Sequence, residues 1–231
     1  MIRTALCATV GLAIAVGFGA AAPAEAGPTV DMIKQAGAIS CGVTTGVPGF
    51  GMPDSQGKYS GFFVDMCRAI SAAIFADPDK VKYVPLTAQQ RFAALQSGEA
   101  DILSNNTTWT LTRDTALGLD FTGITYYDGQ GFMVPRKLGV KSAKELNGAT
   151  VCVPSGSTTE LNLADYFRAN KMTFKPVVIE KVDDVRAAFF SDRCDVYTTD
   201  VSSLYATRAA NVPPPATIAD FVILQIGRAH V

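Results

Sequence analysis

The chain runs through one order of elements twice, and this repeat limits the folds open to it. Shifting the sequence by 94 positions lays residues 91–106 on residues 185–200. Four positions are then identical, with Ala93, Ala94, Ser97 and Asp101 falling on Ala187, Ala188, Ser191 and Asp195. In both stretches a helical apolar pattern leads into a short strand that ends in polar residues. The repeat therefore predicts two similar halves.

The rest of the chain alternates between strand and helix patterns, which is typical of a parallel α/β sheet. Strands are expected at 38–43, 81–84, 100–103, 132–135, 149–153, 175–179 and 194–197, and helices at 31–36, 61–76, 89–96, 143–146, 160–168 and 182–190. We predict an α/β fold of two lobes, each a mainly parallel sheet flanked by helices. Ligands of such sheets bind outside the carboxyl ends of the strands, so facing lobes place both sets of strand-end loops on one cleft.

The N-terminus has the pattern of a secretory signal peptide. Arg3 precedes an apolar run of small residues, and Ala24-Glu25-Ala26 matches a cleavage site. A transmembrane anchor is the alternative, since the apolar run is just long enough to span a bilayer. We assign residues 1–26 to the signal peptide and expect a soluble, periplasmic protein. The formal net charge of −1 and the lack of a basic run argue against a nucleic-acid partner.

Four cysteines follow the signal peptide, and an exported protein with an even number of cysteines usually forms disulfides. Three pairings are open, and the sequence does not choose among them. We favour Cys41–Cys67 and Cys152–Cys194, one bridge within each half. Four free thiols are the alternative. A metal site is not expected, because no two cysteines have CxxC spacing and the only histidine is His230.

The polar loop after the strand at 100–103 has the residues of an anion site. Asn106 and Thr108 precede a helix start at Thr110, and Arg113 lies in its first turn. A helix start offers unpaired backbone N–H groups, and an arginine adds a planar fork that suits a carboxylate. An ordinary loop with a surface arginine is equally compatible with this stretch.

The matching stretches of the second half complete a site for a zwitterion. Ser157 and Thr158 open a helix, and Asp200 follows the strand at 194–197, opposite Asn106 under the shift. A free amino acid needs an anion site and a cation site close together and shielded from water. Arg113 is expected to hold the α-carboxylate, and Asp200 the α-ammonium. A helix N-cap is the alternative role of Asp200.

The chain resembles the periplasmic solute-binding proteins of polar-amino-acid ABC transporters, most of all their general L-amino-acid branch. The stretches that carry this resemblance are 57–65, 91–98, 106–114, 121–134, 157–167 and 194–200. The resemblance implies a two-lobed type II binding-protein fold that closes on its ligand and docks on a membrane permease. It implies ligand contacts from Arg113, Asp200, Asn106, Thr108, Ser157 and Thr158.

Two further positions bear on specificity. Basic-amino-acid relatives often carry an acid at the first strand end, where this chain has Thr44, so the resemblance implies broad specificity. Phe50 is expected either to line the side-chain pocket or to be a packed loop aromatic. We expect a monomer that binds free L-amino acids and acts with an ABC-transporter permease, without a cofactor or metal.

Two other functions remain open on the same scaffold. One is a periplasmic enzyme such as a cyclohexadienyl or arogenate dehydratase, which needs a spare acid or base beside the ligand. The residues after the signal peptide place no Ser-His pair and no paired carboxylates there. The other is the sensor domain of a receptor.

The C-terminal end departs from the family pattern. Family members usually continue further and return to the first lobe with closing helices. We expect an incomplete lobe 1 at residues 27–131, lobe 2 at residues 132–225, and a sequencing-adapter artefact at residues 226–231.

Overall fold

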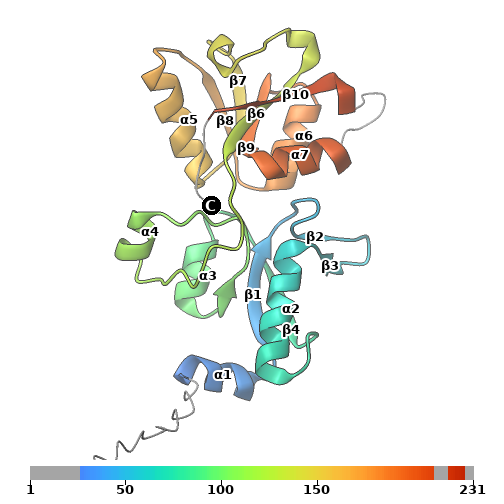
Figure 1. The fold of residues 1–231 in the computed structure, drawn as a ribbon, viewed down its shortest axis with the longest axis vertical. Coiled ribbons are helices and arrows are strands. Elements are labelled where there is room, and N and C mark those ends of the chain that lie inside the picture. Colours follow the sequence, from blue (N-terminus) through green and yellow to red (C-terminus); the bar gives the residue numbers. More distant parts are fainter. Residues whose placement is uncertain (1–26, 211–217, 227–231) are drawn as a thin grey trace, which may run out of the picture.

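The computed structural model describes residues 27–210 and 218–226 and divides them between two lobes. The lobes lie end to end, with one central sheet in each (Figure 1). We call lobe 1 the part built on the first sheet, residues 27–118, and lobe 2 the part built on the second, residues 130–226. The segment 119–129 joins them. The predicted signal peptide and residues 227–231 lie outside the described residues.

Lobe 1 is built on three parallel strands. β1 (Ile39–Thr44) lies between β4 (Val81–Leu86) and β5 (Ile102–Leu103). β2 (Met52–Pro53) and β3 (Tyr59–Ser60) form a separate antiparallel hairpin. The helices of this lobe are α1 (Pro28–Ala36), α2 (Phe62–Phe75), α3 (Arg91–Ser97) and α4 (Leu111–Ala116).

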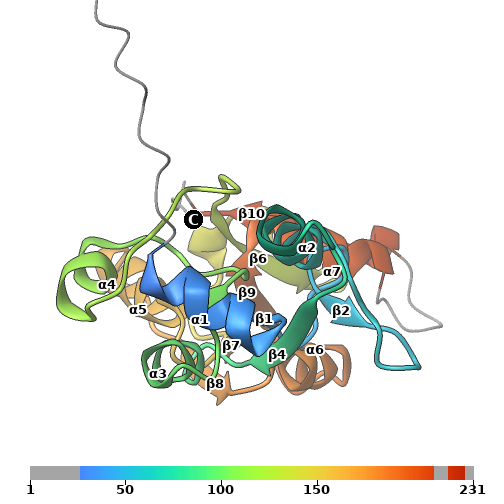
Figure 2. The ribbon, with the colours of Figure 1, turned by 90° about the horizontal axis from the view of Figure 1, so that it is seen from below.

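Helices cover both faces of the first sheet. Cys67 of α2 packs with Cys41 and Val43 on one face, and Ala94 of α3 packs with Val84 and Leu86 on the other. Figure 2 shows α2 and α3 on opposite sides of β1 and β4. Both connections that precede β4 and β5 therefore contain a helix, which is how parallel neighbours are joined.

Lobe 2 is built on five strands. Their order is β10 (Phe221–Gln225), β6 (Gln130–Pro135), β9 (Val196–Asp200), β7 (Thr150–Pro154) and β8 (Lys175–Ile179). The helices of this lobe are α5 (Thr158–Ala169), α6 (Val182–Phe190) and α7 (Val201–Ala210), with 3₁₀ turns η1 (Arg136–Leu138), η2 (Ala143–Glu145) and η3 (Ile218–Asp220).

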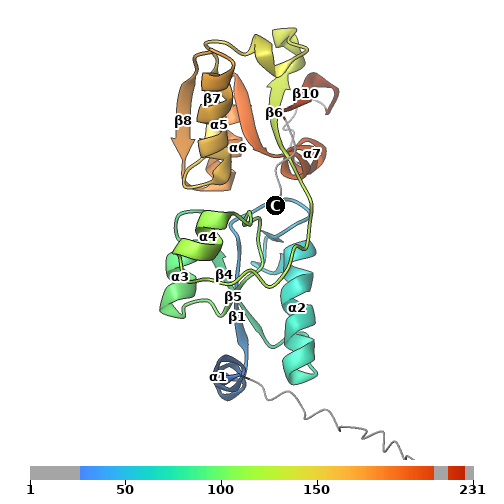
Figure 3. The ribbon, with the colours of Figure 1, turned by 60° about the vertical axis from the view of Figure 1, so that its left-hand side comes forward.

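Two apolar clusters hold lobe 2 together, one on each face of its sheet. Leu163 and Phe167 of α5 pack on one face, around Phe132. Phe189 of α6 and Leu204 of α7 pack on the other. Figure 3 shows α5 and α7 on opposite sides of this sheet. A strand buried on both faces has to be apolar throughout, and Phe132–Val134 are fully buried.

The two-lobed α/β fold is confirmed, and one part of its description is corrected. The first sheet is parallel, as predicted. The second is mixed, because β6 runs antiparallel to both β9 and β10, while β7 is parallel to β8 and β9. Helix α7 and strand β10 were not predicted. The helix expected at 143–146 is the 3₁₀ turn η2, and the strand expected at 194–197 begins at Val196.

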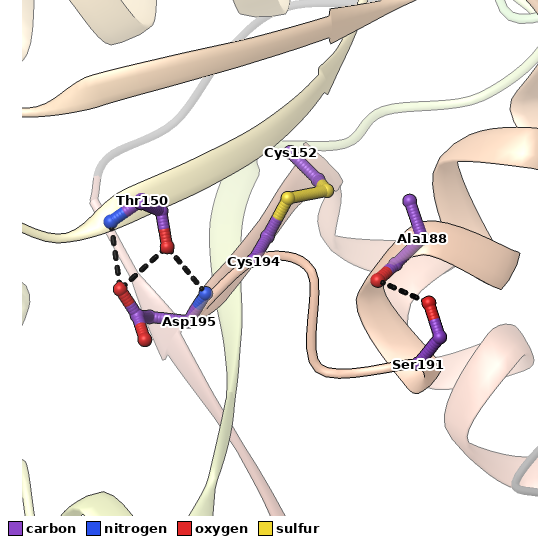
Figure 4. Close-up of a disulfide and its surroundings, with 6 residues drawn as sticks. All are labelled: Thr150, Cys152, Ala188, Ser191, Cys194 and Asp195. Carbon is purple, nitrogen blue, oxygen red and sulfur yellow. Dashed lines mark hydrogen bonds between the residues drawn. A yellow bond between two sulfur atoms is a disulfide. The ribbon is translucent and has the colours of Figure 1, made fainter.

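The four cysteines form two disulfides, Cys41–Cys67 and Cys152–Cys194, which are the pairs favoured from the sequence. The first ties β1 to α2, and the second ties β7 to the turn before β9. Figure 4 shows Thr150 and Asp195 beside the second bridge. The Asp195 carboxylate accepts hydrogen bonds from the Thr150 backbone N–H and hydroxyl. These contacts lower the pKa of Asp195, the side-chain hydrogen bond most. Each bridge stays within one lobe.

Within the ranges 27–210 and 218–226, no helix is both long and apolar enough to cross a membrane.

Each disulfide is expected to stabilise its own lobe. Replacing Cys152 and Cys194 by alanine removes a cross-link over 42 positions, which should lower the free energy of unfolding by about 2–4 kcal/mol. Urea unfolding of the variant and the parent protein measures the difference. Mass mapping of non-reduced peptides is the companion test, and a peptide that links Cys41 to Cys152 or Cys194 would refute the pairing.

Candidate functional site

The polar strand ends of the two lobes meet between the two sheets. Asn106 follows β5 in lobe 1, and Asp200 ends β9 in lobe 2. The Asn106 side-chain amide donates a hydrogen bond of 3.0 Å to the Asp200 carboxylate. These are the two positions that the internal repeat superimposes. The repeat thus identified residues that touch across the lobes.

A second contact joins two loops, one from each lobe, that carry Thr108 and Thr158. The hydroxyl oxygens of Thr108 and Thr158 lie 2.9 Å apart. Thr158 begins α5, and Ser157 caps that helix by accepting a hydrogen bond from the Glu160 N–H. The Glu160 carboxylate accepts in turn from the Gly156 N–H, which closes the loop before the helix. The loop expected at the helix start is therefore held in place at the lobe boundary.

Arg113 is buried, with 9% of its surface exposed. Its Nη1 atom donates a hydrogen bond of 2.8 Å to the Thr108 carbonyl, and its guanidinium lies 5.0 Å from the ring centre of Phe92. Helix α4 is only six residues long, so its dipole adds little to an anion site here. The guanidinium is the positive group of this loop. Its role as the carboxylate ligand stays a prediction.

Asp200 is a carboxylate with little access to water, since 8% of its surface is exposed. Burial raises its pKa to about 6, because the charged form loses hydration. The hydrogen bond from Asn106 and the charge of Arg91 oppose this rise, while the charge of Asp128 adds to it. A buried carboxylate of this kind is stabilised most by a cation that is itself removed from water in the site.

Arg91 was missed by the sequence analysis. It is the first residue of α3, only 4% of its surface is exposed, and its Nη1 atom donates to the Asn106 carbonyl over 3.3 Å. Burial lowers its pKa to about 9, with the like charge of Arg113 adding to this and Asp200 opposing it. Its position in the helical pattern could have indicated this burial. Arg91 lies three residues before Ala94, so both side chains fall on the buried face of α3.

These groups surround a cavity of about 30 Å³ between the lobes. Arg91, Asn106, Asp200, Ser157 and Thr158 line it, and Arg113 is not among its lining residues. Thr44 lines it as well. A hollow of about 280 Å³ adjoins the cavity and shares Asn106 and Asp200 with it. Residues of lobe 1, of the segment 119–129 and of the start of α7 line this hollow.

Phe50 lines this larger hollow and not the cavity itself. Its ring packs against Phe63 and Tyr126, with centroid distances of 5.3 and 5.5 Å. The packed aromatic, one of the two roles expected of Phe50, is therefore observed. A role of Phe50 in contacting ligand stays a prediction.

Two more contacts join the lobes. Arg186 of α6 donates to the Gly46 carbonyl and forms an ion pair with Asp183 over 2.7 Å. Thr87 donates to Glu180 over 3.2 Å. We call the contact of Arg186 and Asp183 with Gly46 the latch. Gly46 has a φ of +154°, and a Cβ atom there would lie 2.5 Å from the Asp183 carboxylate, so only glycine fits.

The described part of the chain brings no group of three or more His, Cys, Asp or Glu side chains together in a way that suits a metal. The cavity offers instead guanidinium, carboxylate, amide and hydroxyl groups. These are the partners of a small molecule with both charges, and they are supplied by both lobes. Closure of the lobes around such a molecule would complete its contacts.

Comparison with known proteins agrees with this geometry. Residues 39–203 match the model of the bacterial extracellular solute-binding proteins, family 3. The chain belongs to this family. The match includes the strand ends of both lobes.

Two bacterial amino-acid-binding proteins are similar in sequence to most of this chain. A general L-amino acid-binding periplasmic protein of Rhizobium johnstonii is 56% identical over 88% of the chain and 59% of its own length. A glutamate/glutamine/aspartate/asparagine-binding protein of Rhodobacter capsulatus is 53% identical over the same shares. The chain thus spans about three fifths of the length of these relatives.

A solved structure is similar as well. A periplasmic binding protein from Brucella ovis with glutathione bound is 56% identical, with a TM-score of 0.81 over 87% of this chain and 63% of that one. A cysteine-binding protein from Campylobacter jejuni is 26% identical, with a TM-score of 0.76.

The latch is expected to hold the two lobes together at Gly46. Gly46→Ala adds a methyl group against Asp183 and strains the backbone, so the lobes should no longer meet at this point. Small-angle X-ray scattering is expected to show a larger radius of gyration than for the parent protein. Gly123→Ala is the matched control, because no atom lies within 4 Å of its added Cβ. Superimposable curves for Gly46→Ala and the parent would contradict the latch.

Proposed function

We propose that this solute-binding protein captures free L-amino acids in its interlobe cavity and passes them to the membrane permease of an ABC transporter. The observation that carries the proposal is the buried carboxylate of Asp200 in one cavity with the buried guanidinium of Arg91. The guanidinium of Arg113 lies against the same Phe92 ring as that of Arg91. The α-ammonium and α-carboxylate of an amino acid are the matching pair. In a site shielded from water each pairing is stronger than in solution.

Each polar residue of the site has a role in this proposal. Asp200 takes the α-ammonium, and Asn106 orients the carboxylate through the bond the two already share. Arg113 takes the α-carboxylate. The hydroxyls of Thr108 and Thr158 lie in contact across the lobes, so a ligand beside this pair can bond to both. Ser157 keeps the start of α5 in place.

The relatives support the class of ligand. The Rhizobium protein is named for general L-amino acids, and the Rhodobacter protein for glutamate, glutamine, aspartate and asparagine. Glutathione, bound in the Brucella structure, carries a free α-ammonium and α-carboxylate at its γ-glutamyl end. An α-amino-acid head is common to all of these molecules. We propose that the same head is held here.

The proposal includes where and how the protein acts. It is exported to the periplasm by residues 1–26 and works as a monomer of two lobes. Thr44 and Phe50 face the side chain of the ligand. The protein acts without catalysis.

Removal of the arginine fork tests the carboxylate site. Arg113→Ala is expected to weaken the binding of L-glutamine by a factor of about 30 or more, since a buried charge-assisted pair is lost. Isothermal titration calorimetry measures the affinity. Arg168→Ala is the control, because Arg168 lies on α5 with 79% of its side chain exposed and pairs with Asp165 on the same helix. An unchanged affinity of Arg113→Ala for L-glutamine would remove Arg113 from the site.

The raised pKa of Asp200 predicts a pH dependence of binding. An α-ammonium pairs with the ionised carboxylate, so below pH about 6 each bound molecule of L-glutamine must displace a proton from Asp200. The affinity should fall about tenfold for each pH unit below this value and level off above it.

Calorimetry in two buffers of different ionisation enthalpy counts the released protons. Asp200→Asn should bind weakly and release none. Proton release that persists in Asp200→Asn would show that another group titrates.

A further inference from the structure

Lobe 2 also meets lobe 1 through a glycine, Gly156. It is the second residue after β7, and its φ is +70°. A Cβ atom at Gly156 would lie 2.5 Å from the Cγ atom of Gln89 and 3.3 Å from both the backbone N and the Cα atom of Gln89. Gln89 lies two residues before α3 in lobe 1. We call this contact of Gly156 with Gln89 the seat. A side chain at Gly156 would push Gln89, and lobe 1 with it, away from lobe 2.

The seat is the counterpart of the latch under the internal repeat. The shift of 94 positions lays Gln89 on Asp183, which is the residue that Gly46 meets in the latch. Gly46 is the second residue after β1, as Gly156 is after β7. Each lobe therefore places a glycine against the equivalent point of the other lobe. Such an exchange of equivalent contacts is the pattern of a two-fold symmetric interface.

The lobe 1 side of the seat is a turn held by hydrogen bonds. The Gln90 side chain accepts from the Thr87 N–H over 3.2 Å, and the Thr87 hydroxyl accepts from the Gln90 N–H over 3.4 Å. This reciprocal pair has the form of a capping box, and Gln89 lies between its two members. The side chain of Gln89 can turn away, since the residue is exposed. Its backbone is fixed by the turn and sets the closest approach of Gly156.

The lobe 2 side of the seat is a fixed loop as well. The Gly156 N–H donates to the Glu160 carboxylate over 2.8 Å, and the Ser157 hydroxyl donates to the Pro154 carbonyl over 2.7 Å. The next residue, Thr158, begins α5 and meets lobe 1 through its hydroxyl. The seat and the hydroxyl contact therefore belong to one rigid stretch of lobe 2.

The latch and the seat both adjoin the cavity. Each of their glycines, and each residue that those glycines meet, lies within two positions of a lining residue. These lining residues are Thr44, Ala88, Ser157 and Val182. The depth to which the lobes close at the two glycines therefore sets the distance across the cavity between the groups of lobe 1 and those of lobe 2.

We propose that Gly46 and Gly156 are a matched pair of stops that set how far the lobes close, and that the seat positions the loop of Thr158 against a ligand in the cavity. Gly156 and Gln89 are positioning residues, because neither is among the residues that line the cavity. The part of this inference that concerns amino acids rests on the proposed function. The seat acts on closure and not on one part of a ligand, so its loss should weaken all amino acids by one common factor.

The test adds one methyl group to the seat. Gly156→Ala is compared with the parent protein by isothermal titration calorimetry with L-alanine and with L-glutamine. Both affinities are expected to fall about fivefold or more, and by the same factor, because overpacking a close contact opposes closure. The dissociation rate should rise by most of this factor, since closure retains the bound ligand. A loss confined to one of the two ligands would contradict a role in closure.

Gly139→Ala separates the effect of the methyl group from that of backbone strain. Gly139 also belongs to lobe 2, its φ is +68°, and no atom lies within 4 Å of an added Cβ. An alanine there has the same strain without touching lobe 1, so this variant should bind both ligands as the parent does. Gly46→Ala changes the other stop and should repeat the common loss. It decides the matter if Gly156→Ala does not fold.

A second substitution, on the other side of the seat, identifies the contact itself. Gln89→Ala removes the Cγ atom, which is the atom nearest to the added methyl group. The double variant Gln89→Ala/Gly156→Ala is expected to bind both ligands at least about threefold more tightly than Gly156→Ala alone. A local effect on the loop of Thr158 would not be relieved by a change in the other lobe.

The possible failures can be told apart. If the parent binds neither ligand, the proposed function fails, and small-angle X-ray scattering alone decides on the stops. Gly156→Ala should then have a larger radius of gyration than Gly139→Ala, and equal radii would overturn the stops. If the parent binds both ligands and Gly156→Ala binds them equally well, amino-acid capture stands and the seat is overturned. A double variant that binds no more tightly than Gly156→Ala overturns it as well.

Discussion

The carboxylate of Asp200 is the point on which the arrangement of the lobes depends. It sits at the end of β9 with little access to water, and its nearest partner, the Asn106 amide, comes from the other lobe. Burying a carboxylate is unfavourable, and its raised pKa records this cost. The contact exists because β5 and β9 both direct their carboxyl ends toward the boundary between the sheets. Topology thus creates the site, and the polar residues give it its chemistry.

Many of the strands and helices could be predicted, because their local sequence pattern reflects the faces that they bury in the folded protein. Strand β8 and helix α6 have the predicted bounds, because an apolar run and a helical period reflect the same buried faces. Strand β10 could not be predicted in the same way. Its place next to β6 depends on pairing between segments far apart in sequence, which also makes the second sheet mixed. Local periodicity contains no information about such pairing.

The site residues also divide into those that a local pattern could identify and those that it could not. The 94-residue shift brought Asn106 and Asp200 together, since both end equivalent strands. Arg91 was missed because an arginine at the start of a helix normally lies in water. It is buried on the inner face of α3, where it donates to the Asn106 carbonyl and lines the cavity between the lobes. Residues that acquire their role from a second lobe are the ones a local pattern cannot identify.

The two disulfides and the interlobe contacts act at different levels of the structure. Each bridge cross-links elements of one lobe, so the lobes can move as rigid bodies. Between the lobes, the described residues form hydrogen bonds from polar side chains, among them Asn106 to Asp200 and the pair Thr108 and Thr158. Arg91 and Asp200 line the cavity between the lobes, so their charges are the ones that closure removes from water. A ligand that neutralises these charges therefore favours the closed arrangement by its differential binding, which is the physical requirement for closure coupled to capture.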